Sequence, residues 1–268
     1  MGRLKGAAVV AALVVAIAAS AQGNVVTGAN VKITFRGWLT PRTLPRASTA
    51  PVTLHLRAAL DSTNGLDPPE LERVLVEVNQ HARVDMRGLP ICHLGELEAT
   101  SSIQALTVCR KALIGYGTFR AHIRIPDQAP FPAVGRLLAF SSKLDGRRTI
   151  LAHVFGRNPV PTGQVLAMTF VRSPEPGTFG TALEMDVPEL VAGWGRVKAF
   201  TLTLHRRFLY HGRWRSLISA SCPAPSGFES ALFPAARGTY TLNDGRVITK
   251  LVNGRCHVDP FASAPAAR

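Results

Sequence analysis

Four cysteines are the residues of this 268-residue sequence whose spacing limits their chemistry most narrowly. No C-x-x-C pair occurs, so the tight ligand spacing of a zinc site is missing. The spacing therefore favours two structural disulfides over a metal centre. Three pairings are possible, and we expect Cys92 with Cys109 and Cys222 with Cys256, because each pair flanks one local segment.

Basic and aromatic residues form a second group near residue 210. The group consists of His205, Arg206, Arg207, Tyr210, His211, Arg213, Trp214 and Arg215. Arginine and aromatic side chains at one protruding tip can bind an anionic polymer or acidic lipid head groups. In mild acid, protonation of the two histidines would strengthen that binding. The alternative is a hairpin whose charges only protect its edges from aggregation.

The search for catalytic residues finds no motif. The sequence has no G-x-S-x-G, H-E-x-x-H, P-loop or dinucleotide fingerprint. Glu184 and Asp186 share one strand face and are either a carboxylate pair or solvated acids. The segment from Asp61 to Gly65 lacks the later glutamate of an EF-hand calcium loop and is typical of a polar turn. We therefore predict no catalytic, cofactor-binding or metal-binding residue.

The first residues have the pattern of a secretory signal peptide. Arg3 and Lys5 precede an apolar run at residues 7–19, and small residues follow at the end of that run. Thirteen residues rise about 20 Å as a helix, which is too short to cross a bilayer core of about 30 Å. Cleavage near Ala21 would release a secreted or cell-envelope protein. Membrane contact is then expected only through this peptide or at the surface.

The composition is basic but not specific for a partner. Lys and Arg number 31 against 17 Asp and Glu, which gives a net charge of +14. Loss of Arg3 and Lys5 with the leader would leave 14 − 2 = +12. The arginines are scattered, as GC-rich codon usage produces, so no nucleic-acid partner is expected. The charge indicates either attraction to anionic envelope components or an ordinary solvated surface.

One helix is expected in the chain, over residues 99–114. Ser101 and Gln104 have the spacing of a capping box, and Gly115 is expected to end the helix. The predicted apolar stripe consists of Ile103, Leu106, Arg110 and Leu113.

The remaining segments alternate as strands joined by tight turns. Asp145-Gly146 and Asp244-Gly245 predict two hairpins. A third hairpin is predicted from residues 198–210 and 214–222, with a three-residue loop that places Tyr210 opposite Trp214. Residues 71–84 fit a strand or a helix, and their β-branched residues favour the strand.

These elements predict a mainly β fold, either an antiparallel β-sandwich or a partly open curved barrel with one short helix. We expect a signal peptide at 1–21, a single secreted β domain at 22–258 and a disordered tail at 259–268. A subdivision of the domain near residue 126 remains open, as does the oligomeric state.

Several short motifs occur together between residues 50 and 256. They include Leu89-Pro90-x-Cys92, Cys109-Arg110-x-Ala112, Leu138-Ala139-Phe140, Gly177-Thr178-Phe179-Gly180 and Cys222-x-Ala224-Pro225-x-Gly227-Phe228. This set resembles an uncharacterised family of secreted actinobacterial disulfide-bonded β proteins. The resemblance implies an exported, disulfide-bonded β protein and assigns no site residues.

Three functions are compatible with these observations. Export, positive charge and the lack of catalytic motifs favour a non-enzymatic protein that binds an anionic or glycan envelope component. A curved antiparallel sheet can also enclose an apolar cavity and carry a lipid or another apolar ligand, an alternative that a fully packed interior would exclude. The third possibility is a hydrolase with an unrecognised site.

Overall fold

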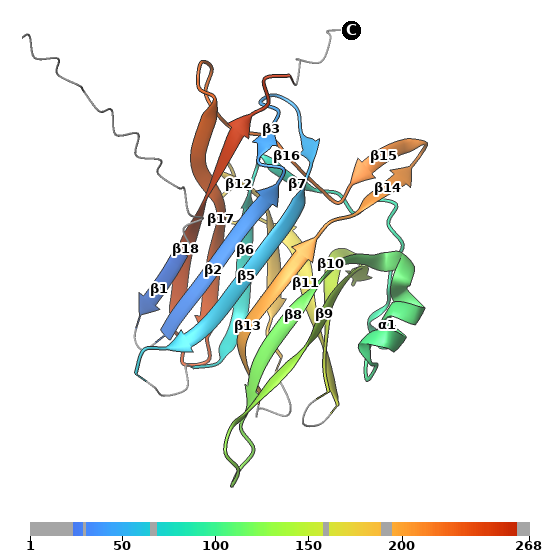
Figure 1. The fold of residues 1–268 in the computed structure, drawn as a ribbon, viewed down its shortest axis with the longest axis vertical. Coiled ribbons are helices and arrows are strands. Elements are labelled where there is room, and N and C mark those ends of the chain that lie inside the picture. The colour runs from blue at the N-terminus through green and yellow to red at the C-terminus, as the bar shows by residue number, and fades with distance from the viewer. Residues whose placement is uncertain (1–23, 29–30, 65–68, 158–160, 189–194, 262–268) are drawn as a thin grey trace, which may run out of the picture.

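Most of the chain folds into one curled β-sheet (Figure 1). The computed structural model describes residues 24–28, 31–64, 69–157, 161–188 and 195–261. The sheet has 13 strands in the order β1-β2-β5-β13-β8-β9-β10-β11-β12-β6-β17-β18-β3. Its strands are β1 (Asn24–Gly28), β2 (Val31–Thr40), β3 (Thr43–Leu44), β5 (Thr53–Ser62), β6 (Leu71–Asn79), β8 (Leu113–Ile123), β9 (Phe131–Leu144), β10 (Arg147–Gly156), β11 (Thr162–Arg172), β12 (Phe179–Asp186), β13 (Gly195–Leu204), β17 (Ser230–Leu242) and β18 (Val247–Val258).

The sheet curls until its two ends lie side by side. β18 lies next to β1 and β2 without pairing with either of them (Figure 1). All neighbouring strands are antiparallel except β18 and β3, which pair in parallel. The predicted mainly β fold with one short helix is confirmed, in the form of a half-barrel. None of the helices within the described residues has the length and hydropathy needed to span a bilayer.

Two tight turns place their hairpins as the sequence predicts. Asp145 and Gly146 both have positive φ, 49° and 74°, and join β9 to β10. Gly245 has a φ of 83° in the turn between β17 and β18. Positive φ at these positions matches the right-handed twist of the strands, which is why Asp-Gly pairs form such turns. Residues 71–84 form β6 and the short β7 (Ala82–Val84), so the strand interpretation is confirmed.

The hairpin predicted from residues 198–210 and 214–222 is wrong. β13 is instead inserted between β5 and β8, which occupy both of its edges. The chain then leaves the sheet and forms a separate two-stranded hairpin from β14 (Arg207–Tyr210) and β15 (Arg213–Ser216). Its loop has two residues, His211 and Gly212, and Tyr210 pairs with Arg213 rather than Trp214. Both loop residues have positive φ, which matches the right-handed twist of the strands. A two-residue turn therefore joins these strands, where a three-residue loop was predicted.

The helix α1 (Ser102–Cys109) covers the outer face of β9 and β10 (Figure 1). Its predicted capping box is present, with Gln104 N donating to Ser101 Oγ and Ser101 N donating to Gln104 Oε1. The predicted apolar stripe is wrong, because Ile103 is 61% exposed. The helix buries Ala105 and Cys109 instead, whose small side chains let it approach the sheet closely.

The end of the helix also differs from the prediction. A 3₁₀ turn, η2 (Arg110–Ala112), follows α1, and β8 begins at Leu113. Gly115 is therefore a strand residue and not the helix stop. A Cβ at Gly115 would come within 2.5 Å of Leu204, so the glycine permits close packing of β8 on β13. Another 3₁₀ turn, η1 (Leu94–Glu96), precedes the helix.

Both disulfides form with the predicted pairing. Cys92 joins Cys109, and Cys222 joins Cys256, with Cα–Cα distances of 5.4 and 5.6 Å. The first holds α1 against the segment before it, and the second joins β18 to the segment that follows β16 (Ile218–Ala220). A small sheet of β4 (Ala50–Pro51), β16 and β7 lies at the upper end of the large sheet in Figure 1.

The predicted leader, residues 1–21, lies outside the described residues, as do residues 262–268 of the predicted tail. The start of that tail is described, and Asp259 N donates a 2.9 Å hydrogen bond to Leu44 O.

Candidate ligand cavity and cationic hairpin

The concave side of the sheet encloses a cavity of about 960 Å³. This volume lies at the upper end of the range of small-molecule pockets, which is about 300–1,000 Å³. The lining is mostly aliphatic and aromatic and comes from nearly all strands of the sheet. Representative lining residues are Phe35, Leu56, Val76, Phe119, Leu166, Met168, Phe170, Leu183, Phe200 and Phe233.

Strand periodicity produces this lining. Val74, Val76 and Val78 alternate along β6, and all three line the cavity, while Leu75 between them does not. Successive side chains of a strand point to opposite faces, so one apolar series per strand builds an apolar interior. Many of these side chains, including Leu166 and Phe170, are only partly buried. A fully packed interior would bury them completely, so the condition that would exclude an apolar-ligand carrier is not met.

The two ends of the cavity differ in their lining, and we name them upper and lower as in the view of Figure 1. The small sheet and the Cys222–Cys256 disulfide lie at the upper end, where Leu217 and Ile218 are buried. At the lower end the Arg196 guanidinium forms an ion pair with Glu70. Arg196 belongs to β13 and Glu70 precedes β6, two strands separated by five others in the sheet order. The ion pair therefore links opposite walls of the cavity.

A histidine and a serine form a polar site in the upper lining. His81 Nδ1 lies 3.2 Å from Ser221 Oγ, and both residues line the cavity. Nucleophilic catalysis would also need a group that orients the histidine. Within the described residues, no carboxylate is hydrogen-bonded to the His81 ring. The arrangement provides a polar contact for a ligand and lacks the third member of a catalytic triad.

Within the described residues, the two ends of the sheet meet without pairing at β2 and β18. β1 pairs with β2 from Val31 to Phe35, and β3 pairs with β18 through Thr43 and His257.

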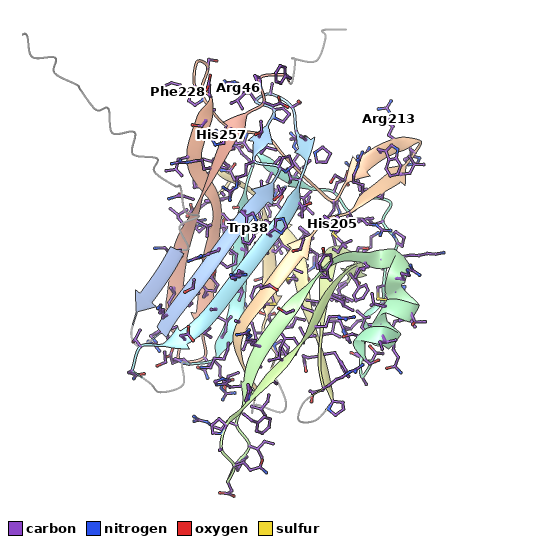
Figure 2. The ribbon with its side chains drawn as sticks, viewed as in Figure 1. Trp38, Arg46, His205, Arg213, Phe228 and His257 are labelled. Carbon is purple, nitrogen blue, oxygen red and sulfur yellow. A yellow bond between two sulfur atoms is a disulfide. The ribbon has the colours of Figure 1, made fainter. Side chains whose placement is uncertain are left out.

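The predicted anion-binding residues lie on the β14–β15 hairpin and just before it. His205 and Arg206 lie between β13 and β14, and the other six belong to the hairpin (Figure 2). The outer face of the hairpin carries Leu209 and Trp214, which pair across the strands and are 60% and 68% exposed. Arg207 lies over the Trp214 ring, with its guanidinium carbon 5.6 Å from the ring centre.

The inner face of the hairpin serves a structural role. Phe208 is buried, and Tyr210 packs against Gly88, where a Cβ would come within 2.1 Å of the ring. Arg215 Nη1 donates a 2.8 Å hydrogen bond to Asp85 Oδ2. Arg215 is therefore neutralised, and the exposed cations of the hairpin are Arg207 and Arg213.

Asp85 is the acidic anchor beneath this hairpin. Its carboxylate accepts hydrogen bonds from Arg87 and Arg215. These bonds, the one from Arg87 above all, hold the pKa of Asp85 well below its usual range, although partial burial acts in the opposite direction. The carboxylate therefore stays ionised at any physiological pH and keeps the hairpin fixed to the body of the protein.

The other acidic candidates take part in ion pairs on the outer face of the sheet. Arg73 Nε lies 2.8 Å from Asp186 Oδ1, and Arg73 Nη1 lies 3.9 Å from Glu184 Oε1. The two carboxylates therefore share one arginine as their ion-pair partner. Asp61 and Ser62 end β5, and Asn64 N donates a 3.2 Å hydrogen bond to Ser62 Oγ in the bend that follows. Gly65, the last residue of the predicted turn, lies outside the described residues.

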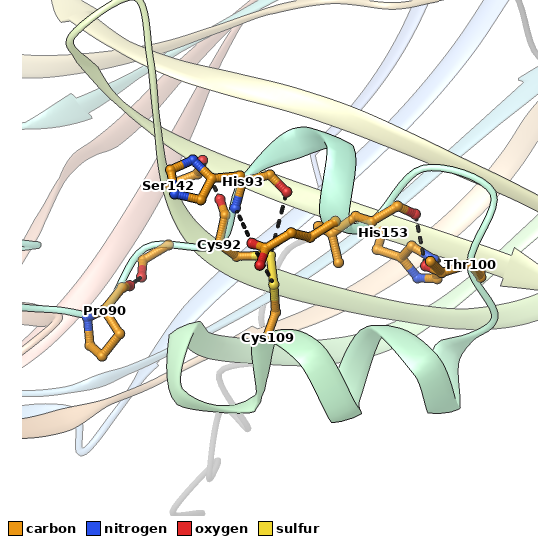
Figure 3. The surroundings of a disulfide bond; sticks show 10 residues. Pro90, Cys92, His93, Thr100, Cys109, Ser142 and His153 are labelled. Atoms are coloured by element: carbon orange, nitrogen blue, oxygen red, sulfur yellow. Dashed lines mark hydrogen bonds between the residues drawn. A yellow bond between two sulfur atoms is a disulfide. The ribbon is translucent and has the colours of Figure 1, made fainter.

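One metal-like grouping occurs in the described residues, at the first disulfide. Ligand atoms of Cys92, Glu96 and Cys109 lie within 4.8 Å of one another. The two sulfurs are bonded to each other, so they are not available as thiolates for a metal. Glu96 instead accepts a 2.7 Å hydrogen bond from His93 N. Ser142 Oγ donates a hydrogen bond to Cys92 O beside the disulfide (Figure 3). This grouping is structural.

No protein-family model matches the chain, and the searches of curated proteins and of solved structures find no significant match either. The resemblance to secreted actinobacterial proteins therefore stays a prediction, and the function is argued from the geometry.

Proposed function

We propose that the protein binds a lipid or another apolar ligand in the cavity of its curled sheet and carries it outside the cytoplasm. The observation that supports this proposal is the apolar cavity of about 960 Å³. Apolar surface exposed to water costs about 25 cal/mol per Å², so a ligand that fills the cavity recovers that free energy. Two disulfides are compatible with an oxidising, extracytoplasmic location, and the signal-like leader agrees with it.

A cavity-filling substitution tests this proposal. Val76 lines the cavity, and Leu75 beside it faces outward and does not. We expect Val76→Phe to weaken binding of the neutral dye N-phenyl-1-naphthylamine about tenfold, since the ring occupies ligand space, whereas Leu75→Phe leaves binding unchanged. Fluorescence titration measures both. A wild-type protein that neither binds the dye nor retains a lipid in a native mass spectrum after secretion would overturn the proposal.

A second candidate function is attachment to an anionic lipid surface through the β14–β15 hairpin. The observation that favours it is the exposed pair Leu209 and Trp214 beside Arg207 and Arg213, which are exposed as well. Tryptophan and arginine together suit a membrane interface, where the ring enters the headgroup region and the cations meet anionic lipids. A carrier that delivers lipid needs such a contact, so the two functions are compatible.

Vesicle sedimentation tests this second function. We expect Trp214→Ser with Arg213→Gln to reduce binding to vesicles that contain an anionic lipid several-fold, and binding to neutral vesicles to be weak for every variant. Leu232→Ser with Arg83→Gln is the matched control, because both residues are exposed and lie outside the hairpin. Equal binding of both double variants would contradict a role for the hairpin.

A further inference from the structure

The outer face of one side of the curled sheet is basic. The neighbouring strands β2, β5, β13, β8 and β9 form this side, and Figure 1 shows it from the outside. Asp61 is the one acidic residue of these five strands, and all their other charged residues are Lys or Arg. Asp61 lies opposite Lys32 near the start of β2. The rest of these strands therefore carries positive charge only.

Backbone register aligns three arginines in one row across the five strands. Arg36 lies opposite Arg57, which lies opposite Thr201 on its other side. Thr201 lies opposite Thr118, and Thr118 lies opposite Arg136. Arg57, Thr201 and Arg136 do not line the cavity, so the row lies on the outer face, where all three arginines are exposed. We call Arg36, Arg57 and Arg136 the arginine row, and the spacing of five strands gives it a length of about 19 Å.

The arginine row has no counter-charge among the described residues. None of its three guanidinium groups forms an ion pair there. On the opposite side of the sheet, by contrast, Arg73 pairs with Asp186 and Arg237 pairs with Glu77. The direct opposition of Arg36 and Arg57 is unfavourable, because like charges in opposed positions destabilise a sheet. An anion bound over the row would relieve this repulsion.

A row of rings runs beside the arginine row. Trp38 lies opposite His55, and Thr203 lies between His55 and Tyr116. Trp38 stacks on His55 with ring centres 5.1 Å apart, and Thr203 Oγ1 lies 3.3 Å from His55 Nδ1. Tyr116 is 53% exposed and meets the ring of His205 edge to face; Trp38 and His205 are labelled in Figure 2. Trp38 and Tyr116 are therefore held about 14 Å apart, in a row about 7 Å from the arginines.

We propose that this outer face binds an acidic polysaccharide, with its acidic groups on the arginine row and its sugar rings on Trp38 and Tyr116. The site is separate from the cavity and does not depend on the carrier function. Arginine suits it because the planar guanidinium donates paired hydrogen bonds to carboxylate and phosphate oxygens. The hydroxyl groups of Thr118 and Thr201, between the arginines, donate to or accept from sugar hydroxyls. The apolar face of a sugar ring packs on an aromatic ring, which offers a large and rigid apolar surface.

The dimensions of the face favour an extended polymer over a small anion or a membrane. The arginine row extends over about 19 Å, which a single small anion does not cover. Trp38 is half-buried and stacked on His55, so it is not free to enter a bilayer as the exposed Trp214 is. Two disulfides are compatible with an extracellular location, which favours a polysaccharide over a nucleic acid as the polyanion.

The first test compares three ligands by isothermal titration calorimetry on the full-length, disulfide-bonded protein. They are a hexauronate from alginate, the neutral maltohexaose and an oligo-dT hexanucleotide. We expect the hexauronate to bind about tenfold more tightly than maltohexaose, since only the first carries carboxylates. This preference should shrink in about 0.5 M NaCl because salt screens exposed charges. The hexanucleotide is expected to bind more weakly than the hexauronate.

Variants identify the residues that hold the polymer. Arg36→Gln with Arg57→Gln is expected to weaken binding of the hexauronate about tenfold. Arg147→Gln with Arg148→Gln removes the same charge from the exposed start of β10 and is the matched control. Circular dichroism and thermal melting verify that both double variants are folded.

A single substitution tests the contact with sugar rings. Tyr116→Ala is expected to weaken binding of the hexauronate several-fold and to leave binding of inorganic polyphosphate, which has no rings, unchanged. Phe228→Ala is the matched control, because Phe228 is 64% exposed and lies outside these five strands.

The outcomes separate this site from the carrier function. Equal affinity for the hexauronate and maltohexaose, or equal affinity of the two double variants for the hexauronate, overturns the arginine row as a binding site. Tighter binding of the hexanucleotide than of the hexauronate makes the face a nucleic-acid surface and overturns the polysaccharide. A Tyr116→Ala variant that binds the hexauronate like the wild type also overturns it. Titration with N-phenyl-1-naphthylamine should be the same for all these variants, so failure of this site leaves the cavity function standing.

Discussion

Two walls of the curled sheet differ in how they are buried. Residues 149–154 of β10 are buried on both faces, because the core packs on the inner face and α1 with its preceding loop covers the outer face. Residues 36–40 of β2 are exposed or half-buried. We therefore expect stability to be concentrated in the β9–β10 wall, while the β2 wall leaves apolar side chains of the cavity lining, such as Leu39, only partly buried.

The largest expected effect contrasts two phenylalanines. Phe140 is fully buried beneath the helix, and Phe170 is half-buried in the cavity lining. We expect Phe140→Ala to lower the free energy of unfolding by about 4 kcal/mol because it leaves a dry cavity in the core. Phe170→Ala should cost about 1–2 kcal/mol, since its site is already next to open space. Urea denaturation measures both, and equal losses would show that the two walls do not differ.

The disulfides provide the next contrast. Replacement of both Cys92 and Cys109 by alanine opens a loop with a sequence separation of 17 and should cost about 3 kcal/mol without changing ligand affinity. Replacement of Cys222 and Cys256, with a separation of 34, should cost about 4 kcal/mol and also weaken ligand binding, since Cys256 lines the cavity. Thermal melting and dye titration measure the two effects. A ligand affinity that depends on both bridges alike would contradict the division of roles.

The smallest expected effect is a pH dependence that arises in the covered wall. His153 is fully buried and its ring contacts Thr100 (Figure 3). Burial lowers the pKa of His153 below 6.5, although its hydrogen bond to Thr100 O acts in the opposite direction. The unfolded chain then binds a proton that the folded chain does not, so stability is complete above pH 6.5 and falls as the pH drops below it, by at most about 1.4 kcal/mol per unit.

Urea titrations between pH 7.5 and 5, on the wild type and on His153→Gln, measure this contribution. A difference between the two proteins that does not change with pH would show that His153 carries no such linkage. Carboxyl groups whose pKa is lowered, such as that of Asp85, titrate in a lower pH range and therefore do not affect this comparison.

Local chemistry explains what the sequence alone predicts correctly. The Asp145-Gly146 turn, the Ser101 capping box and both disulfides depend on residues that are close in the chain. The insertion of β13 between β5 and β8 depends on long-range pairing that alternation does not encode. The exposed Ile103 shows the same limit of prediction from local sequence, because the helix packs on the sheet through the small residues Ala105 and Cys109.

The candidate site is less accessible from sequence than the fold. The eight residues predicted around position 210 are close together, but Arg215 is neutralised by Asp85, a partner 130 residues away. The sequence analysis named an apolar cavity as one possibility but identified none of its lining residues. The alternating valines of β6 were visible as strand residues, but whether inward side chains meet or leave a space depends on the curvature of the whole sheet.

The position of β13 has a consequence for the order in which the molecule is made. β5 and β8 are synthesised long before β13, yet neither has its partner on that side until residue 204 is available. An emerging chain would thus expose two bare strand edges and the apolar lining for the time needed to produce about 80 further residues, which is several seconds at about 5–20 residues per second. Such edges are aggregation-prone. We therefore expect this chain to depend on holding chaperones before it folds, more than a protein built only of sequential hairpins would.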